Sequence, residues 1–338
     1  MTFKFFKGST GPGFSCWPEH FDDAEIGVRE KREGKSKFAL QYMVRSGIAD
    51  MIYPLRLEDL IIYDMERDTC PLKIDWSKTF GGGFAGHNPS STCIEEMRHV
   101  GFSDDAFYAP TSISSATGPY AGTKMWVDPS GKGKDATGWA IVSQGFGKLF
   151  CPALGGFTGV GYSEHVLESI SRLARQHGVN EISIEDAFGS GMFARLLEPI
   201  LINHYCEPGE NPLYPAGWRC SVLCGKETRL FGMKERRIVD TLEPIANSHR
   251  LVMSREAASN PDFQRQWTRI RAERACLDHD DVIESLAEAC RSWSDVLRLD
   301  PEAQAQREHD RQIDQYMDDC RALAGARAKG GPSWFRHD

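Results

Sequence analysis

Residues 124–154 decide the fold, and they read KMWVDPSGKGKDATGWAIVSQGFGKLFCPAL. Three apolar runs, at 124–128, 137–143 and 148–154, are separated by short turns that contain glycine. Short apolar runs joined by tight turns predict three strands of an antiparallel meander. The first strand ends on Asp128, immediately before a Pro-Ser-Gly turn.

Downstream of the meander, the pattern changes to alternating helices and strands. A helix is predicted from Ser163 to His177, because Ser163 suits a helix start, Gly178 suits a helix end and the apolar residues recur at helical spacing. Further strands are predicted at 181–185, 219–224 and 250–253 (the last at a sheet edge), and further helices at 189–205, 233–247, 263–274 and 280–297. This order predicts an α/β fold, a ribonuclease-H-like mixed sheet with a three-strand meander, parallel strands and flanking helices.

The rest of the chain divides into three further regions. Residues 1–64 carry helical patterns at 22–33 and 38–44 and two short edge-like runs near 53–63. Residues 65–122 are rich in Gly, Ser, Thr, Asn and Pro, and they predict a linker or irregular connection with room for a short hairpin. Residues 123–298 form the ribonuclease-H-like domain, and residues 299–338 are predicted to be a charged helical or flexible tail.

The overall composition excludes several classes of protein. Forty-eight acidic against forty basic residues give a net charge of −8, which argues against a protein that coats nucleic acid by bulk charge. The sequence contains neither an apolar run near 18 residues nor the apolar core of a signal peptide, so we expect no membrane association. Ten cysteines without a repeated spacing favour free thiols in a reducing compartment.

Four acids stand at the ends of predicted elements. Asp128 ends the first strand of the domain, Glu185 ends the fourth, and Asp280 and Asp281 open the last helix. Each has an ordinary explanation alone, as a turn former, an ion-pair partner or a favourable charge at a helix start. Strands one and four are neighbours in a sheet of this order, so their ends can converge, and a helix on that face can bring its first turn to the same point.

Clustered carboxylates predict bound cations, because like charges held together raise one another's pKa values and hard divalent cations relieve the repulsion. Two Mg²⁺ or Mn²⁺ ions at such a site can activate water and stabilise the departing oxygen in phosphodiester hydrolysis. Helical geometry favours Asp280 over Asp281 as a direct ligand, because Asp280 lies closer to the apolar face that packs on the sheet.

Five segments carry a resemblance to a known family. They are residues 127–138 (VDPSGKGKDATG), 184–193 (IEDAFGSGMF), 232–244 (GMKERRIVDTLEP), 249–252 (HRLV) and 279–287 (HDDVIESLA). In order and spacing the sequence resembles the nuclease domain of the large terminase of short-tailed, T7-like phages. Upstream, residues 38–43 and 53–57 more weakly resemble the end of that family's motor domain.

The resemblance implies a metal-dependent endonuclease that cuts concatemeric viral double-stranded DNA during genome packaging, with Asp128, Glu185, Asp280 and Asp281 as its catalytic, metal-binding acids. It also implies a motor ATPase, a small terminase and a portal as partners, and the host cytoplasm as location. No G-x-x-x-x-G-K-[ST] motif is present, and residues 131–134 have the wrong spacing, so we do not expect this chain to hydrolyse ATP by itself.

Basic residues near these motifs are candidates for binding the DNA backbone. Lys132 and Lys134 follow Asp128 in the turn, while Lys234 and Arg237 belong to a segment, 218–274, with twelve basic and seven acidic residues. No base-reading element is apparent, which favours sequence-tolerant cutting through backbone contacts.

Three alternatives are compatible with the same pattern. Another ribonuclease-H-like nuclease, such as a junction resolvase or a recombinase, would use the same acids on a different DNA shape. An actin-like nucleotide-binding domain shares the meander but requires a second phosphate loop, which is not found. A non-catalytic docking module would have no reason to cluster carboxylates.

Overall fold

The computed structural model describes residues 53–76, 92–101, 105–130, 136–159, 161–185, 191–204, 218–225 and 233–294. It also describes five helical residues near the start of the chain, Glu25, Val28, Arg29, Arg32 and Glu33, which belong to the first predicted helix. The predictions for residues 38–44, 132, 134 and 299–338 lie outside the described residues.

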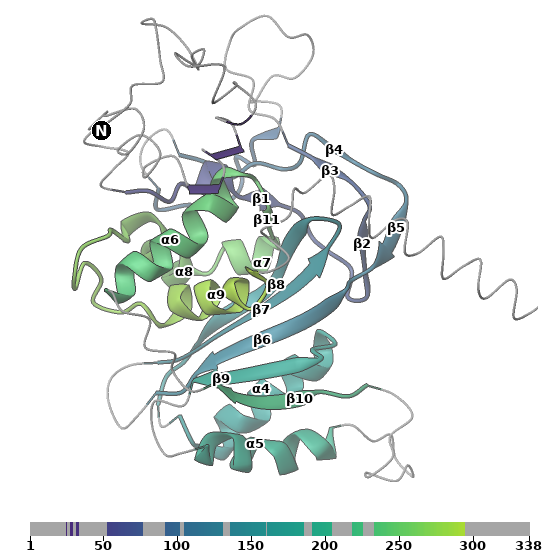
Figure 1. Ribbon diagram of the computed structural model, residues 1–338, viewed down its shortest axis with the longest axis vertical. Coiled ribbons are helices and arrows are strands. Elements are labelled where there is room, and N and C mark those ends of the chain that lie inside the picture. Colours follow the sequence, from purple (N-terminus) through teal and green to yellow (C-terminus); the bar gives the residue numbers. More distant parts are fainter. Residues whose placement is uncertain are drawn as a thin grey trace, which may run out of the picture.

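A seven-stranded sheet forms the centre of the molecule (Figure 1), with the strand order β1-β11-β8-β7-β6-β9-β10. Its strands are β1 (Ile61–Ile62), β6 (Gly122–Asp128), β7 (Thr137–Gly145), β8 (Lys148–Phe157), β9 (Glu181–Glu185), β10 (Ser221–Gly225) and β11 (Leu251–Met253). β6, β7 and β8 pair antiparallel, whereas β9 pairs parallel with β6, β10 with β9 and β11 with β8. The predicted meander and mixed sheet are therefore confirmed.

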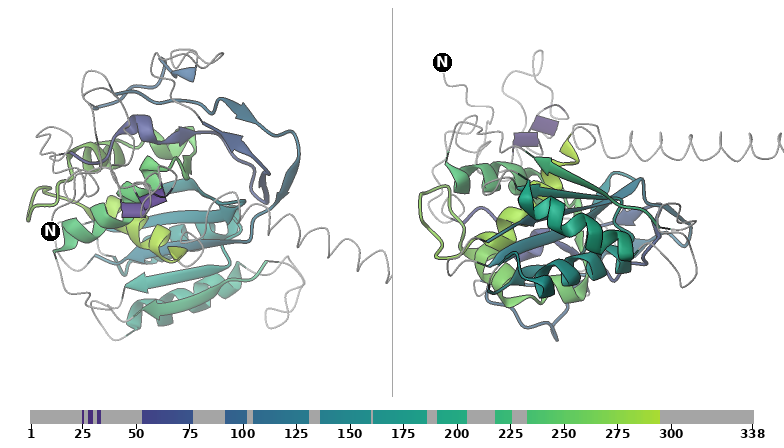
Figure 2. Two further views of the ribbon diagram at one scale, coloured as in Figure 1. Left: turned by 45° about the horizontal axis from the view of Figure 1, so that its top comes forward. Right: turned by 90° about the horizontal axis from the view of Figure 1, so that it is seen from below.

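Helices cover both faces of this sheet (Figure 2). On one face, α4 (Glu164–Gln176) and α5 (Met192–Asn203) pack with Met125, Val127 and Ile182. The opposite face carries α6 (Lys234–Asn247), α7 (Arg255–Ala258), α8 (Pro261–Arg269) and α9 (Asp281–Arg291). The alternation of β6 decides which side chains meet which layer, because successive side chains on a strand point to opposite faces. The even-numbered residues of β6, ending with Asp128, consequently face the α9 side.

Residues 53–64, which the sequence predicted as edge-like runs ahead of this domain, pack onto its sheet. β1 pairs with β11, so β11 is an interior strand and not the predicted edge. Leu55, Leu57 and Leu60 are at most 1% exposed, and they join the same core cluster as the helices α6 to α9. A short 3₁₀ helix, η2 (Leu57–Asp59), leads into β1. Burial of these leucines fixes the segment to the sheet, since each removes apolar surface from water.

The region predicted as a linker contains two small antiparallel sheets. β2 (Thr69–Pro71) pairs with β5 (Thr117–Pro119), and β3 (Ile74–Asp75) pairs with β4 (Ser112–Ile113). Tyr63, Met65, Leu72, Trp76 and Tyr120 pack against a third cluster that includes Phe150 of β8 and Val252 of β11. In its described part, this region is an arm folded onto the sheet and not a free connection.

No helix in the described part of the chain combines the length and the apolar character needed to cross a bilayer.

Candidate active site

Asp128 and Glu185 meet at the ends of two adjacent parallel strands. Val127 of β6 is in register with Ile184 of β9, so the next residue of each strand lies side by side on the α9 face. The two carboxyl groups are within hydrogen-bonding distance of each other. The predicted convergence of these strand ends is thereby confirmed, although their chemical roles stay predictions.

A carboxyl pair in contact requires a shared proton or a cation. Burial raises the pKa of Asp128 to about 9, and the hydrogen bond and negative charge of Glu185 add to the effect. In the absence of a bound cation, Asp128 therefore carries a proton at neutral pH, because two adjacent carboxylates cannot both ionise without compensation.

Gly138 allows the last helix to reach these acids. Gly138 of β7 is the register partner of Asp128, and it has no side chain on the α9 side. A Cβ atom there would lie 2.3 Å from the carbonyl oxygen of Asp281 and 2.7 Å from Oγ of Ser285. The first turn of α9 thus rests directly on the backbone of β7, beside the end of β6.

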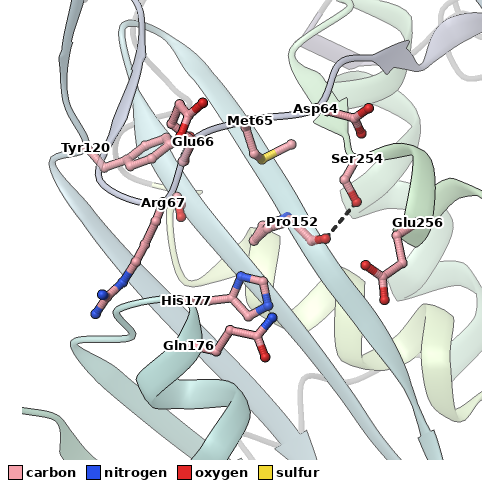
Figure 3. A pocket seen from close by; sticks show the side chains of 11 residues that line it. Asp64, Met65, Glu66, Arg67, Tyr120, Pro152, Gln176, His177, Ser254 and Glu256 are labelled. Atoms are coloured by element: carbon pink, nitrogen blue, oxygen red, sulfur yellow. Dashed lines mark hydrogen bonds between the residues drawn. The ribbon is translucent and has the colours of Figure 1, made fainter.

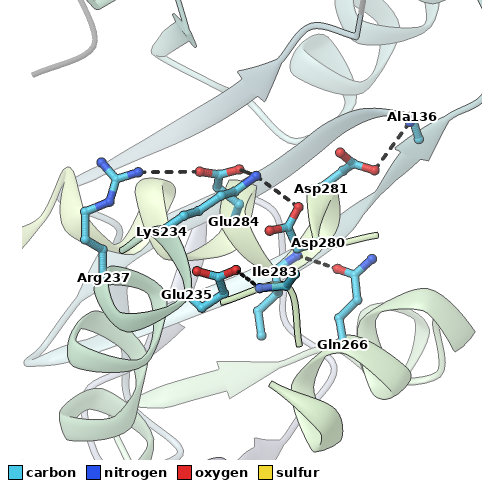
Figure 4. Close-up of polar contacts among 10 residues, drawn as sticks. Ala136, Lys234, Glu235, Arg237, Gln266, Asp280, Asp281, Ile283 and Glu284 are labelled. Carbon is cyan, nitrogen blue, oxygen red and sulfur yellow. Dashed lines mark hydrogen bonds and ion pairs between the residues drawn. The ribbon is translucent and has the colours of Figure 1, made fainter. Parts of the chain in front are cut away.

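Lys234 holds two acids of α9 together. Its ammonium lies 2.9 Å from Oδ1 of Asp280 and also contacts Oε2 of Glu284 (Figure 4). Burial opposes the charged form of Lys234, but the charges of Glu284 and Asp280 outweigh it and raise the pKa of the lysine. The ammonium is therefore a fixed positive charge among the carboxylates.

Glu284 is a site residue that the sequence predictions did not include. It is only 6% exposed, and burial raises its pKa to about 7, with the charges of Asp280 and Glu185 contributing in the same direction. Glu284 follows Asp280 by four residues, so both acids lie on the same face of the helix. That spacing was the available signal, but Glu284 stands between apolar residues that define the buried face of α9.

Asp281 points to a different contact. Its carboxylate accepts a hydrogen bond from the backbone N–H of Ala136 at 3.3 Å, on the side of the helix turned away from Lys234 (Figure 4). The structure thus brings Asp128, Glu185, Asp280 and Glu284 into one neighbourhood, whereas Asp281 ties the helix start to the segment before β7.

Of the four basic residues predicted to contact DNA, two lie beside the acids and two lie outside the described residues. Lys234 is already bound by two carboxylates, so a phosphate contact would require it to leave one of them. Arg237 lies one turn further along α6, with its guanidinium 3.9 Å from Oε1 of Glu284. Lys132 and Lys134 fall in the turn outside the described residues.

The donor chemistry of the site suits divalent cations. All four acids supply oxygen ligands, which Mg²⁺ and Mn²⁺ prefer. In the described part of the chain, no three acidic, histidine or cysteine side chains are arranged as a ready-made cage. The contacts of the Lys234 ammonium show that Asp280 and Glu284 can hold a positive charge. Asp128 and Glu185 need a nearby positive charge if both are to be ionised.

A hollow of about 300 Å³ lies away from these acids, between the end of α4, the start of α7 and residues 64–67 (Figure 3). His177, Arg67, Tyr120 and Glu256 are among its lining residues, and none of the four acids borders it. Burial lowers the pKa of His177. The hollow and the acid cluster are therefore separate features.

Comparison of the sequence with known proteins identifies relatives. Residues 127–251 match the family described as the ribonuclease H-like domain of the bacteriophage T7 terminase. The large terminase subunit of Enterobacteria phage T3 is 31% identical over 300 residues, which is 84% of this chain and 46% of that protein. The chain therefore spans less than half the length of this relative.

Solved structures of terminase nuclease domains are also similar to part of this chain. The human cytomegalovirus terminase nuclease domain, soaked with manganese and bound to an inhibitor, aligns over 53% of this chain and 86% of its own, with 15% identity and a TM-score of 0.37. A K428A mutant nuclease domain of the large terminase subunit gp2 of bacterial virus Sf6, with manganese and β-thujaplicinol, aligns over 51% and 88%, with 11% identity and a TM-score of 0.36. The strand order and the family match of residues 127–251 together give the chain a ribonuclease H-like fold, as the sequence predicted.

Proposed function

We propose that this chain is a metal-dependent endonuclease that cuts concatemeric double-stranded viral DNA during genome packaging in the host cytoplasm. The observation that carries the proposal is the contact between Asp128 and Glu185, with Asp280 and Glu284 gathered around one ammonium beside them. The similarity of residues 127–251 to a terminase domain supports the same activity. The proposed partners are a motor ATPase, a small terminase and a portal, as the resemblance of the sequence motifs to T7-like terminases implies.

Asp128, Glu185 and Asp280 are the proposed ligands, with Glu284 as an additional acid and Asp281 supporting the helix start. Two Mg²⁺ or Mn²⁺ ions held there would activate a water molecule and stabilise the departing oxygen of the phosphodiester. Before that, Asp128 must lose its proton, because a protonated carboxyl group is a poor ligand.

The basic residues have two proposed tasks. Lys234 balances Asp280 and Glu284 when no metal is bound, and it turns toward a DNA phosphate when the ions take over that charge. Arg237, Lys132 and Lys134 are the further proposed contacts to the backbone. Such contacts position a duplex without reading its sequence.

The test is cleavage of supercoiled plasmid with Mn²⁺, with Mg²⁺ and with EDTA. We expect cleavage with either ion and none with EDTA, and a loss of at least about 100-fold in Asp128→Ala and Glu185→Ala, since each removes a carboxylate that holds the ions. Asp262→Asn, at an exposed acid of α8, is the matched control and should cut like the parent protein.

Two results would contradict the proposal: cleavage that persists in Asp128→Ala, or cleavage that EDTA leaves unchanged. A strong preference for branched over linear duplexes would instead identify a junction-resolving nuclease with the same acids.

A further inference from the structure

An open strip of sheet adjoins the acid cluster on the α9 side. Side chains of β9 and β10 alternate between the two faces, and Ile182, Ile184 and Cys220 belong to the core beneath α4 and α5. The intervening residues, Ser183, Glu185, Ser221 and Leu223, therefore point to the same side as Asp128.

Register sets these residues in three rows across β6, β9 and β10. Asp128 and Glu185 form the first row, Trp126, Ser183 and Leu223 the second, and Lys124, Glu181 and Ser221 the third. Rows on one face are two residues apart along a strand, which is about 6.6 Å. Leu223 thus lies within about 8 Å of the acid row, measured between backbone positions.

The strip is exposed where the rest of the α9 face is covered. α9 packs on β7 and β6, and Ala140 and Val142 of β7, which belong to the core beneath α9, are fully buried. In contrast, Leu223 is 48% exposed and Ser221 is also exposed. Within the described residues, this is the exposed part of the sheet that continues directly from the acids.

Beyond the acid row, the strip is close to neutral. Glu181 is its only acid beyond the first row among the described residues, and it is paired with Lys124, whose Nζ lies 3.2 Å from Oε1 of Glu181. The same ammonium lies 4.8 Å from the centre of the Trp293 ring. Two hydroxyl groups and a leucine remain on the outer part, so no unpaired carboxylate there repels phosphate.

We propose that the strip formed by Ser183, Ser221 and Leu223 carries the backbone of duplex DNA on one side of the cut. This inference rests on the proposed nuclease function and adds the path of the substrate. The hydroxyl group of Ser183 donates to a phosphate oxygen, and Leu223 contacts the sugars. The hydroxyl group of Ser221 donates to the carbonyl oxygen of Asn180 at 3.3 Å in this structure, and it exchanges that partner for a phosphate oxygen when DNA binds. None of these groups reads base edges, so the strip positions DNA without selecting a sequence.

The experiment places a negative or a positive charge at each of two similarly exposed leucines. Leu223 lies on the strip, and Leu196, 42% exposed, lies on α5, which packs on the opposite side of β10. Leu223→Glu, Leu223→Lys, Leu196→Glu and Leu196→Lys are prepared in an Asp128→Asn background, so that DNA is not cut. Affinity for a linear duplex is measured by fluorescence anisotropy from 50 to 200 mM salt, with thermal unfolding as the check on folding.

We expect Leu223→Glu to weaken binding about tenfold at 50 mM salt and Leu223→Lys to strengthen it several-fold. Leu223→Lys should also steepen the slope of log K against log salt by about 0.9, which is one further phosphate contact. Both Leu196 variants should stay within about twofold of the background protein, because they change the net charge equally but lie off the strip.

The inference is overturned if the Leu223 variants behave like the Leu196 variants, or if they change self-association in sedimentation without changing DNA affinity, which would indicate a protein contact. Plasmid cleavage by the parent protein is recorded separately. A parent that cuts DNA while Leu223 has no effect refutes the strip alone, whereas a parent that neither cuts nor binds DNA refutes the proposed function and the strip together.

Discussion

Asp128 is held where ionisation of its carboxyl group lowers the stability of the fold. Its carboxyl group is buried against Glu185, and its pKa of about 9 means that ionisation in the folded protein is costly without a cation. Lys234 relieves part of the local charge, but it pairs with Asp280 and Glu284 and not with Asp128. Functional sites commonly carry such strained electrostatics, because the groups are arranged for a charge that arrives with the ligand.

The pH dependence of stability follows from this arrangement. The unfolded chain ionises Asp128 near its ordinary pKa of about 3.9, whereas the folded protein holds the proton up to about pH 9. The contribution of Asp128 to the free energy of unfolding is therefore fully present below pH 4, and it is lost as the pH rises through 9. In EDTA, the free energy of unfolding of the parent should fall relative to Asp128→Asn as the pH rises from 5 to 9, by several kcal/mol, because each pH unit below the folded pKa contributes about 1.4 kcal/mol.

Urea unfolding at pH 5, 7 and 9 measures this difference. Asp262→Asn, at an exposed acid, is the control and should follow the parent at every pH. Parallel curves for the parent and Asp128→Asn would show that Asp128 has an ordinary pKa and would remove the electrostatic case for a metal site.

At the scale of elements, the site depends on how closely α9 approaches β7. Replacing Gly138 by Ala places a methyl group 2.3 Å from the Asp281 carbonyl oxygen, so the first turn of α9 must shift. We expect Gly138→Ala to cost about 1–3 kcal/mol of stability, as overpacking does, and to reduce plasmid cleavage about tenfold or more, because Asp280 and Glu284 move with the helix.

Gly156→Ala is the matched control for this prediction. Gly156 is the register partner of Gly138 on β8, and a methyl group there would lie 3.1 Å from Cβ of Ala136 and, at ordinary contact distance, 3.7 Å from Cγ2 of Val282. Equal cleavage by Gly138→Ala and the parent would mean that the position of α9 does not govern the reaction.

The same elements show what the sequence could predict. β6 and β9 were predicted at nearly their observed bounds, because each alternates apolar and polar residues and ends at a clear signal. The meeting of Asp128 with Glu185 followed from the strand order. Glu284 was not predicted, because an acid inside an apolar helical face is recognised only when its partner, Lys234 of α6, is seen beside it.

β1 was not predicted as part of the sheet, for a related reason. It has only two residues, and its place beside β11 is fixed by contacts with residues about 190 positions later in the sequence. Local periodicity carries no information on such a pairing. The segment around Leu57 and Leu60 was therefore predicted only as short strands or edge segments, although both leucines are fully buried.

At the scale of the whole molecule, the smallest stable unit should begin before residue 60 and not at residue 123. Leu60 is fully buried in the core shared with α6 to α9, so Leu60→Ala should cost about 2–4 kcal/mol through lost burial and the cavity left behind. Val100→Ala, at a side chain 47% exposed, should stay within about 0.5 kcal/mol of the parent.

A protein limited to residues 123–298 uncovers β11 and the Phe150 cluster, so it should unfold less cooperatively and at lower temperature than one spanning residues 53–298. Calorimetry of the two lengths measures this, and identical transitions would show that residues 53–122 are the separate connection that their composition suggested.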